Sequence, residues 1–148
     1  MTDDLVLRGQ VCFALYAASR AMTDVYRGIL DPVGLTYPQY LVLLVLWERD
    51  GDTTTVSELG AALRLDSGTL SPLLKRLAGA GLVVRQRAAD DERRVEVGLT
   101  DAGRALRQRV ADVPARIARA TGLSVPELVA LRDTLNQVTE TIHRQKER

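Results

Sequence analysis

Cys12 is the only cysteine among the 148 residues of the chain, and its thiol is the group best suited to redox chemistry. Oxidants react with the thiolate, and a free thiol has a pKa about 1.5 units above neutral pH, so hydrogen bonds from nearby hydroxyl groups can favour the charged form. On a helix, Tyr16 and Tyr26 would each lie about 40° from Cys12 in azimuth, one on either side of it. Along the axis, however, Tyr26 would lie about 21 Å from Cys12, at about 1.5 Å per residue. The two residues share a site only if an antiparallel second copy of the helix brings Tyr26 to Cys12.

The alternative is a purely structural role for Cys12, because a lone cysteine on a helical face is commonly a buried, unreactive residue. One cysteine cannot form an intrachain disulfide. The single histidine, His143, cannot build a metal site with that cysteine alone. We therefore expect neither a metal ion nor a cofactor.

Two short helices predicted between residues 55 and 79 carry groups suited to binding DNA. Thr55 and Glu58 have the spacing of a capping box, and Asp66 provides the N-cap of the second helix. That helix turns four leucines inward: Leu70, Leu73, Leu74 and Leu77. Its outward residues are small, hydroxylated or basic, which suits the edges and phosphates of a major groove. They are Ser67, Thr69, Ser71, Lys75 and Arg76. An ordinary solvated amphipathic helix is the alternative.

A charged hairpin follows the second helix and favours the DNA-binding alternative. Residues 82–87 and 95–99 are predicted as strands, joined by a loop over residues 88–94, and residues 53–55 are a candidate edge strand. The loop places Arg93, with Arg94 as a second candidate, where it can enter a minor groove beside the recognition helix. Asp91 is expected to brace these arginines. The whole segment predicts a winged helix-turn-helix.

The flanking segments are predicted to be helical. A long helix with one apolar stripe runs from Leu5 to about Arg27, and an almost wholly apolar helix, capped by Thr36 with Gln39, runs to about Arg49. After the wing, we expect a helix from Asp101 toward Ala120 that is interrupted or bent at Pro114. Ser124 and Glu127 then cap a last helix with a narrow apolar seam. The seam consists of Leu128, Leu131, Leu135, Val138 and Ile142.

These elements predict a mainly α fold with a small β-wing, assembled as an intertwined homodimer through its N- and C-terminal helices. We divide the chain into a dimerisation helix (residues 1–35), a DNA-binding lobe (residues 36–100) and C-terminal dimerisation helices (residues 101–148), all within one structural unit. Two-fold symmetry would place two recognition helices about one DNA turn apart and match an inverted-repeat operator in double-stranded DNA.

Composition limits the possible functions. Apolar residues make up 46% of the chain and charged residues 26%, so the chain is expected to be globular rather than disordered. The net charge of +1 gives no overall attraction for nucleic acid, and DNA binding must rest on local basic clusters. No apolar run reaches the roughly 18 residues of a membrane span, and the start Met1–Asp4 lacks the basic head of a signal peptide. We expect a cytoplasmic protein that does not contact a membrane.

Four stretches of sequence resemble one protein family. The wing segment DERRVEVGLT, from Asp91 to Thr100, resembles the MarR family of bacterial transcription regulators. Three others are similar to the organic hydroperoxide sensors called OhrR within that family: CFALYAASR from Cys12, LTYPQYL from Leu35 and LDSGTLSPLLKR from Leu65.

The resemblance implies roles for several residues. Cys12 would be the peroxide sensor, with Tyr26 and Tyr37 hydrogen-bonded to its sulfur across the dimer interface. Because a second cysteine is absent, the chain is similar to the one-cysteine type, in which a small-molecule thiol caps the sulfenic acid or further peroxide oxidises it. Apolar surroundings would favour organic hydroperoxides. The candidate pocket residues are Phe13, Tyr16 and Trp47.

The sequence is compatible with three hypotheses about function. In the first, the protein is a homodimeric repressor, not an enzyme, that leaves its operator when an organic hydroperoxide oxidises Cys12. In the second, a small aromatic ligand releases the DNA and Cys12 only packs. In the third, Cys12 turns over as a thiol peroxidase; it is disfavoured because no resolving cysteine and no oxyanion-stabilising cluster accompany it.

Overall fold

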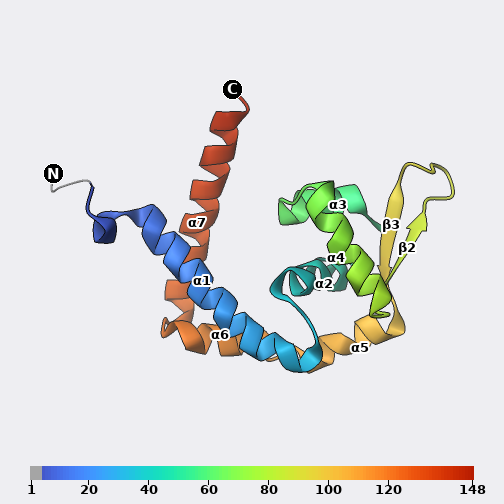
Figure 1. Ribbon diagram of the computed structural model, residues 1–148, viewed down its shortest axis with the longest axis horizontal. Helices are drawn as coiled ribbons and strands as arrows, with labels where there is room; N and C mark the ends of the chain where they lie inside the picture. Colours follow the sequence, from blue (N-terminus) through green and yellow to red (C-terminus); the bar gives the residue numbers. More distant parts are fainter. Residues whose placement is uncertain (1–4) are drawn as a thin grey trace. The chain divides into compact units, whose positions relative to one another are not determined.

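A computed structural model describes residues 5–148. Its helices and strands follow one another in the predicted order, and the strands form one small sheet (Figure 1). The acidic start Met1–Asp4, on which the expectation about a signal peptide rests, lies outside the described residues. The chain divides into two compact units, Met1–Ala111 and Asp112–Arg148. The first unit contains η1 (Leu7–Gly9), α1 (Val11–Leu30), η2 (Asp31–Val33), α2 (Tyr37–Glu48), β1 (Thr54–Thr55), α3 (Val56–Leu63), α4 (Ser67–Gly79), β2 (Val83–Arg87), β3 (Val95–Leu99) and α5 (Asp101–Arg109). The second contains α6 (Val113–Thr121) and α7 (Val125–Lys146).

The core of the first unit forms around α2, the helix that the sequence predicts to be buried. Thr36 and Gln39 make the full capping box, with the Gln39 side chain accepting from the Thr36 N–H at 3.0 Å. Because α2 is apolar on nearly all sides, neighbouring elements can cover it from several directions. Its buried side chains include Val42, Leu43 and Leu46. The four predicted inward leucines of α4 are buried as well, so this part of the fold is confirmed.

The sheet has the order β1-β3-β2, and both pairings are antiparallel. Val83 lies opposite Leu99, Arg87 lies opposite Val95, and the two residues of β1 pair with Glu96 and Val97. The expected edge strand is therefore present. Together, α3, α4 and this hairpin confirm the winged helix-turn-helix.

The first helix begins and ends later in the chain than predicted. It begins at Val11 rather than Leu5, because Gln10 is extended (φ −86°, ψ 118°) and separates it from the short turn η1. It also continues past Arg27, the predicted end, to Leu30. The break comes instead at the 3-10 turn η2, which ends at Gly34 in the left-handed region (φ 72°).

The helix predicted over residues 101–120 is interrupted rather than bent, and the interruption comes before Pro114. The backbone leaves helical geometry at Val110 (φ −111°, ψ 11°), after the end of α5. Pro114 then lies in the first turn of α6, where its missing N–H costs no helical hydrogen bond. The proline therefore helps to begin a helix and does not bend one.

Only one of the two hydrogen bonds of the predicted capping box forms at the start of α3. The Glu58 N–H donates to Thr55 Oγ1 at 3.1 Å, as expected. The Glu58 carboxylate, however, pairs with Arg49 at 3.0 Å instead of returning to the Thr55 backbone. This ion pair ties the start of α3 to the end of α2.

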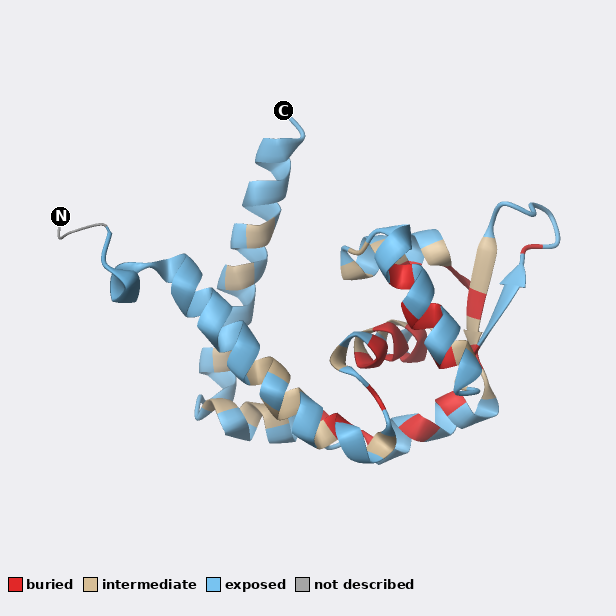
Figure 2. Cartoon of the chain, viewed as in Figure 1, coloured by how far each residue is buried: buried red, intermediate tan, exposed pale blue. Residues whose placement is uncertain are grey.

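The second unit has well-defined helix ends and little core. Ser124 and Glu127 form the full capping box that the sequence predicts, and Gly122 (φ 70°) ends α6. No residue of α7 is buried, and the seam residues Leu131 and Ile142 are 46% and 48% exposed (Figure 2). The apolar seam is therefore only partly covered within one chain.

Among the described residues, no single helix is both long and apolar enough to cross a membrane. The segments Val11–Val33 and Tyr37–Glu48 meet those criteria only as a pair, and the pair is bent by 72°.

Candidate sensor and DNA-binding sites

The second helix of the helix-turn-helix, α4, presents the predicted set of outward residues. The Thr69 N–H donates to Asp66 Oδ1 at 2.7 Å, and this bond holds the pKa of the Asp66 carboxyl below its usual range. Since the leucines on the opposite face are buried, the other face is left to solvent. Ser67, Thr69, Ser71, Lys75 and Arg76 are all exposed.

The turn between α3 and α4 is tight. Arg64 adopts the left-handed conformation (φ 55°, ψ 41°) at the end of α3. A Cβ atom on Gly60 would lie 2.8 Å from the Leu65 carbonyl oxygen, so only glycine permits this approach of α3 to the turn. The geometry matches a helix-turn-helix that projects its second helix outward.

The two arginines of the wing, Arg93 and Arg94, differ in their ion pairs. The Arg94 guanidinium lies 3.1 Å from Asp90 and 3.4 Å from Glu96, so its charge is neutralised locally. The Arg93 guanidinium has no ion pair or hydrogen bond with any residue in the range 5–148. Asp91 accepts a hydrogen bond from the Arg93 backbone N–H at 2.9 Å, and it thus braces the loop rather than the arginine side chain. Arg93 is the better placed of the two to meet a phosphate or a minor groove.

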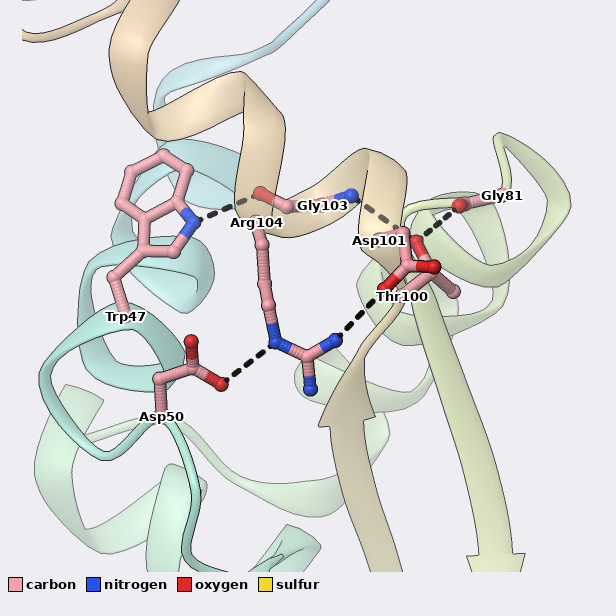
Figure 3. Close-up of polar contacts among 7 residues, drawn as sticks. All are labelled: Trp47, Asp50, Gly81, Thr100, Asp101, Gly103 and Arg104. Atoms are coloured by element: carbon pink, nitrogen blue, oxygen red, sulfur yellow. Dashed lines mark hydrogen bonds and ion pairs between the residues drawn. The ribbon is translucent and has the colours of Figure 1, made fainter.

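Polar contacts join α5 to the end of α2 and to the turn before β2 (Figure 3). The indole N–H of Trp47 donates to the Gly103 carbonyl at 2.9 Å, and the Thr100 hydroxyl donates to the Gly81 carbonyl at 2.6 Å. Arg104 pairs with Asp50 at 3.0 Å. Trp47, a predicted pocket residue, is thus buried and serves to hold α5.

Three tyrosines cluster where α1 and α2 meet. The ring centroids of Tyr26 and Tyr37 are 4.4 Å apart, and those of Tyr26 and Tyr40 are 5.9 Å apart. Burial, reinforced by the charges that Tyr37 and Tyr40 would carry, raises the pKa of Tyr26 to about 12. Burial also raises the pKa of Tyr37. Both phenols are protonated at neutral pH, as hydrogen-bond donors to a thiolate must be.

Cys12 lies far from this cluster within one chain. It is exposed at the start of α1, and its thiol has no hydrogen bond with any described residue. Because Val11–Leu30 is one continuous helix, Tyr26 lies about 21 Å further along its axis. Phe13 and Tyr16, the other predicted pocket residues, are exposed near Cys12, and Arg20 lies over the Tyr16 ring. One chain thus carries the thiol and the phenols at separate places.

Sequence reasoning did not assign Tyr40 to the sensor, although it packs beside Tyr26 and its pKa is also raised by burial. The spacing of Tyr37 and Tyr40, three residues apart on a helix, was the available signal, because such residues share a face. Tyr40 in turn stands 6.4 Å from the Trp47 ring. The aromatic cluster therefore extends into the core of the lobe.

Comparison with known proteins places the chain among transcription regulators. Residues 24–110 match the family model described as transcriptional regulator SarA/Rot. The organic hydroperoxide resistance transcriptional regulator of Bacillus subtilis is 45% identical over 95% of both chains. The regulator TtmR of Methylorubrum extorquens is 48% identical over 95% of this chain and 71% of its own. Among solved structures, reduced AbfR bound to DNA, a protein of Staphylococcus epidermidis, superposes with a TM-score of 0.76 at 36% identity and covers 92% of this chain and 94% of its own.

Proposed function

Because the chain belongs to the MarR family of winged-helix transcription regulators, in its group of organic hydroperoxide resistance regulators, we propose that it is a redox-controlled repressor. The reduced protein binds operator DNA, and oxidation of Cys12 by an organic hydroperoxide releases it. Such a regulator acts on DNA in the cytoplasm.

The observation that carries this proposal is the separation of Cys12 from the tyrosine pair along α1. An antiparallel dimer places Tyr26 and Tyr37 of the partner subunit beside Cys12, so each interface contains two identical sites. The uncovered apolar residues support this assembly, since α1 buries only Leu30 and α7 buries none of its residues.

The chemistry at Cys12 is a two-electron oxidation. The thiolate attacks one oxygen of the hydroperoxide, the O–O bond breaks, and a sulfur–oxygen bond forms. The sulfur becomes a sulfenic acid, while the leaving alkoxide takes up a proton and departs as the alcohol. Tyrosine hydroxyls stabilise the thiolate beforehand by donating hydrogen bonds to it. A small-molecule thiol then condenses with the sulfenic acid, which forms a mixed disulfide and water, or more peroxide oxidises it to the sulfinic acid.

The modified cysteine changes the dimer because a close-packed interface does not absorb extra atoms continuously. Added oxygen or a thiol adduct on Cys12 pushes against the partner's tyrosines, and within each chain Tyr26 packs on both Tyr37 and Tyr40. The distance between the two lobes then no longer matches the spacing of an inverted repeat. In the reduced dimer, α4 enters the major groove and Arg93 the minor groove.

The test uses a DNA duplex selected by the reduced wild-type protein, treated with one equivalent of cumene hydroperoxide with and without a small thiol. Wild type should release the duplex while mass spectrometry shows an oxygen or thiol adduct on Cys12. Cys12→Ser should bind equally well and stay bound, and it keeps both methionines, so it controls for their oxidation. Peroxide-driven release of Cys12→Ser would contradict the proposal.

Two other outcomes separate the rival functions. If wild type stays bound with Cys12 oxidised in the presence of thiol, a ligand-controlled regulator is the better description. If peroxide is consumed in large excess over protein, Cys12 turns over as a peroxidase.

A further inference from the structure

The two faces of the wing sheet differ in how their charges are arranged. Side chains alternate between the faces along a strand, so Val83, Arg85 and Arg87 point the same way from β2. The register places Arg85 opposite Val97 and Arg87 opposite Val95. Val83 and Val97 on this face are 2% exposed. The arginines therefore continue, beyond the core, the face that packs on the helices of the lobe.

The opposite face carries charges that neutralise each other. Glu96 lies there with Val84 and Gln86, and it accepts from Arg94, which also pairs with Asp90. Arg94 is therefore already paired with two carboxylates, those of Asp90 and Glu96. An additional phosphate would have to displace them.

Arg85 and Arg87 have no such partners. Both are exposed, their cross-strand neighbours are valines, and neither guanidinium forms an ion pair or hydrogen bond with any residue of the described range 5–148. The segment from Lys75 to Arg87 contains four basic residues and no acidic one, although the whole chain carries a net charge of only +1. The sequence thus concentrates unneutralised positive charge on this side of the sheet.

The position of this row relative to α4 identifies its partner. β2 packs against α4, whose outward residues are those proposed to enter the major groove. In Figure 1 the wing loop and the α3–α4 turn lie toward the same side of the first unit. A duplex that engages both would bring its phosphate backbone past β2, which leads from the end of α4 to the wing loop.

We propose that Arg85 and Arg87 form a phosphate-binding row on β2 that holds the DNA backbone beside the groove entered by α4. This inference rests on the proposed DNA binding and adds two contacts to it. Since phosphates are the same in every sequence, the row contributes affinity and orientation and does not select bases.

The experiment measures binding of the reduced full-length variants Arg85→Gln, Arg87→Gln and the double variant to two duplexes, over a range of salt concentrations. One duplex is selected by wild type, and the other has the same composition in scrambled order. Each phosphate contact contributes about 0.9 to the slope of log affinity against log salt. Because a homodimer carries each substitution twice, a single variant should lower the slope by about 1.8 and the double variant by about 3.6. Affinity for both duplexes should fall about tenfold or more for a single variant.

The matched control is Arg107→Gln, which removes the same charge from an exposed site on α5. It should leave the slope unchanged. An unchanged slope for the β2 variants, or a loss confined to the selected duplex, would overturn the proposal. Failure of the proposed function looks different, because wild type itself would then bind no duplex or fail to respond to peroxide.

Discussion

The winged lobe and the long helices α1 and α7 are built in opposite ways. The lobe, from α2 to β3, buries leucines on α3 and α4 and valines on the sheet, and Trp47 and Arg104 hold α5 on it. By contrast, α1 buries only Leu30, and α7 buries none of its seam residues. The DNA-reading part is complete within one chain, whereas the long helices need a second copy.

The proposed sensor lies across that division. The tyrosines pack where α1 meets the lobe, and Cys12 lies at the uncovered end of α1. A site assembled from both kinds of region responds to oxidation only through the interface that joins them. The contrast can therefore be tested by perturbing each region separately.

The largest effect is expected from a charge in the α7 seam. Leu131→Asp places a carboxylate where the dimer would bury it, and it should raise the dimer dissociation constant at least about 100-fold, or roughly 3 kcal/mol. Sedimentation equilibrium measures the change. Asn136→Asp, which adds the same charge at an exposed site of α7, should remain dimeric. If both variants dimerise equally, α7 is not part of the interface.

An effect of similar size, on stability instead of dimerisation, is expected inside the lobe. A Cβ atom on Gly103 would overlap the Leu82 carbonyl oxygen, so Gly103→Ala should destabilise the protein by about 3 kcal/mol. Gly28→Ala, on α1, meets nothing within 4 Å and should stabilise it by up to about 1 kcal/mol through helix propensity. Urea unfolding at one fixed protein concentration compares the two. Equal effects would mean that lobe and long helix are packed alike.

The elements with strong periodicity were predictable from the sequence. The inward leucines of α4, the caps at Thr36, Asp66 and Ser124, and the paired strands depend on local spacing, and the structure has them. The start of α1 and the end of α5 were not predictable, because they depend on single backbone conformations at Gln10 and Val110. Nothing in their side chains indicates these conformations.

The candidate site was predictable only in part. Geometry alone indicated that Cys12 and Tyr26 need a second chain, while the role of Tyr37 came from family resemblance. What brings Tyr37 onto Tyr26 is the tight reversal at Asp31–Gly34, held by the Leu35 N–H donating to the Leu30 carbonyl. Such a reversal depends on tertiary packing, since Leu30 and Leu35 are both buried beneath it.

The smallest effect is expected from the titration of Tyr26. Its pKa is raised to about 12 in the folded protein by burial among Tyr37 and Tyr40, against an ordinary value of about 10. Between these values the unfolded chain loses the phenolic proton while the native protein keeps it, so the free energy of unfolding should fall as pH rises from about 10 to 12 and be unaffected below. Tyr26→Phe should flatten this fall, measured by urea unfolding across that range, whereas Tyr16→Phe, at an exposed site, should not.

The same titration shows to which region the tyrosines belong. The Tyr26–Tyr37–Tyr40 contacts all lie within one chain, so the dimer-deficient Leu131→Asp protein should keep the wild-type pH profile. If its profile instead matched that of Tyr26→Phe, the second subunit would be supplying the burial. The tyrosine cluster would then depend on the dimer for its packing, and oxidation of Cys12 would have no prepacked cluster to push against.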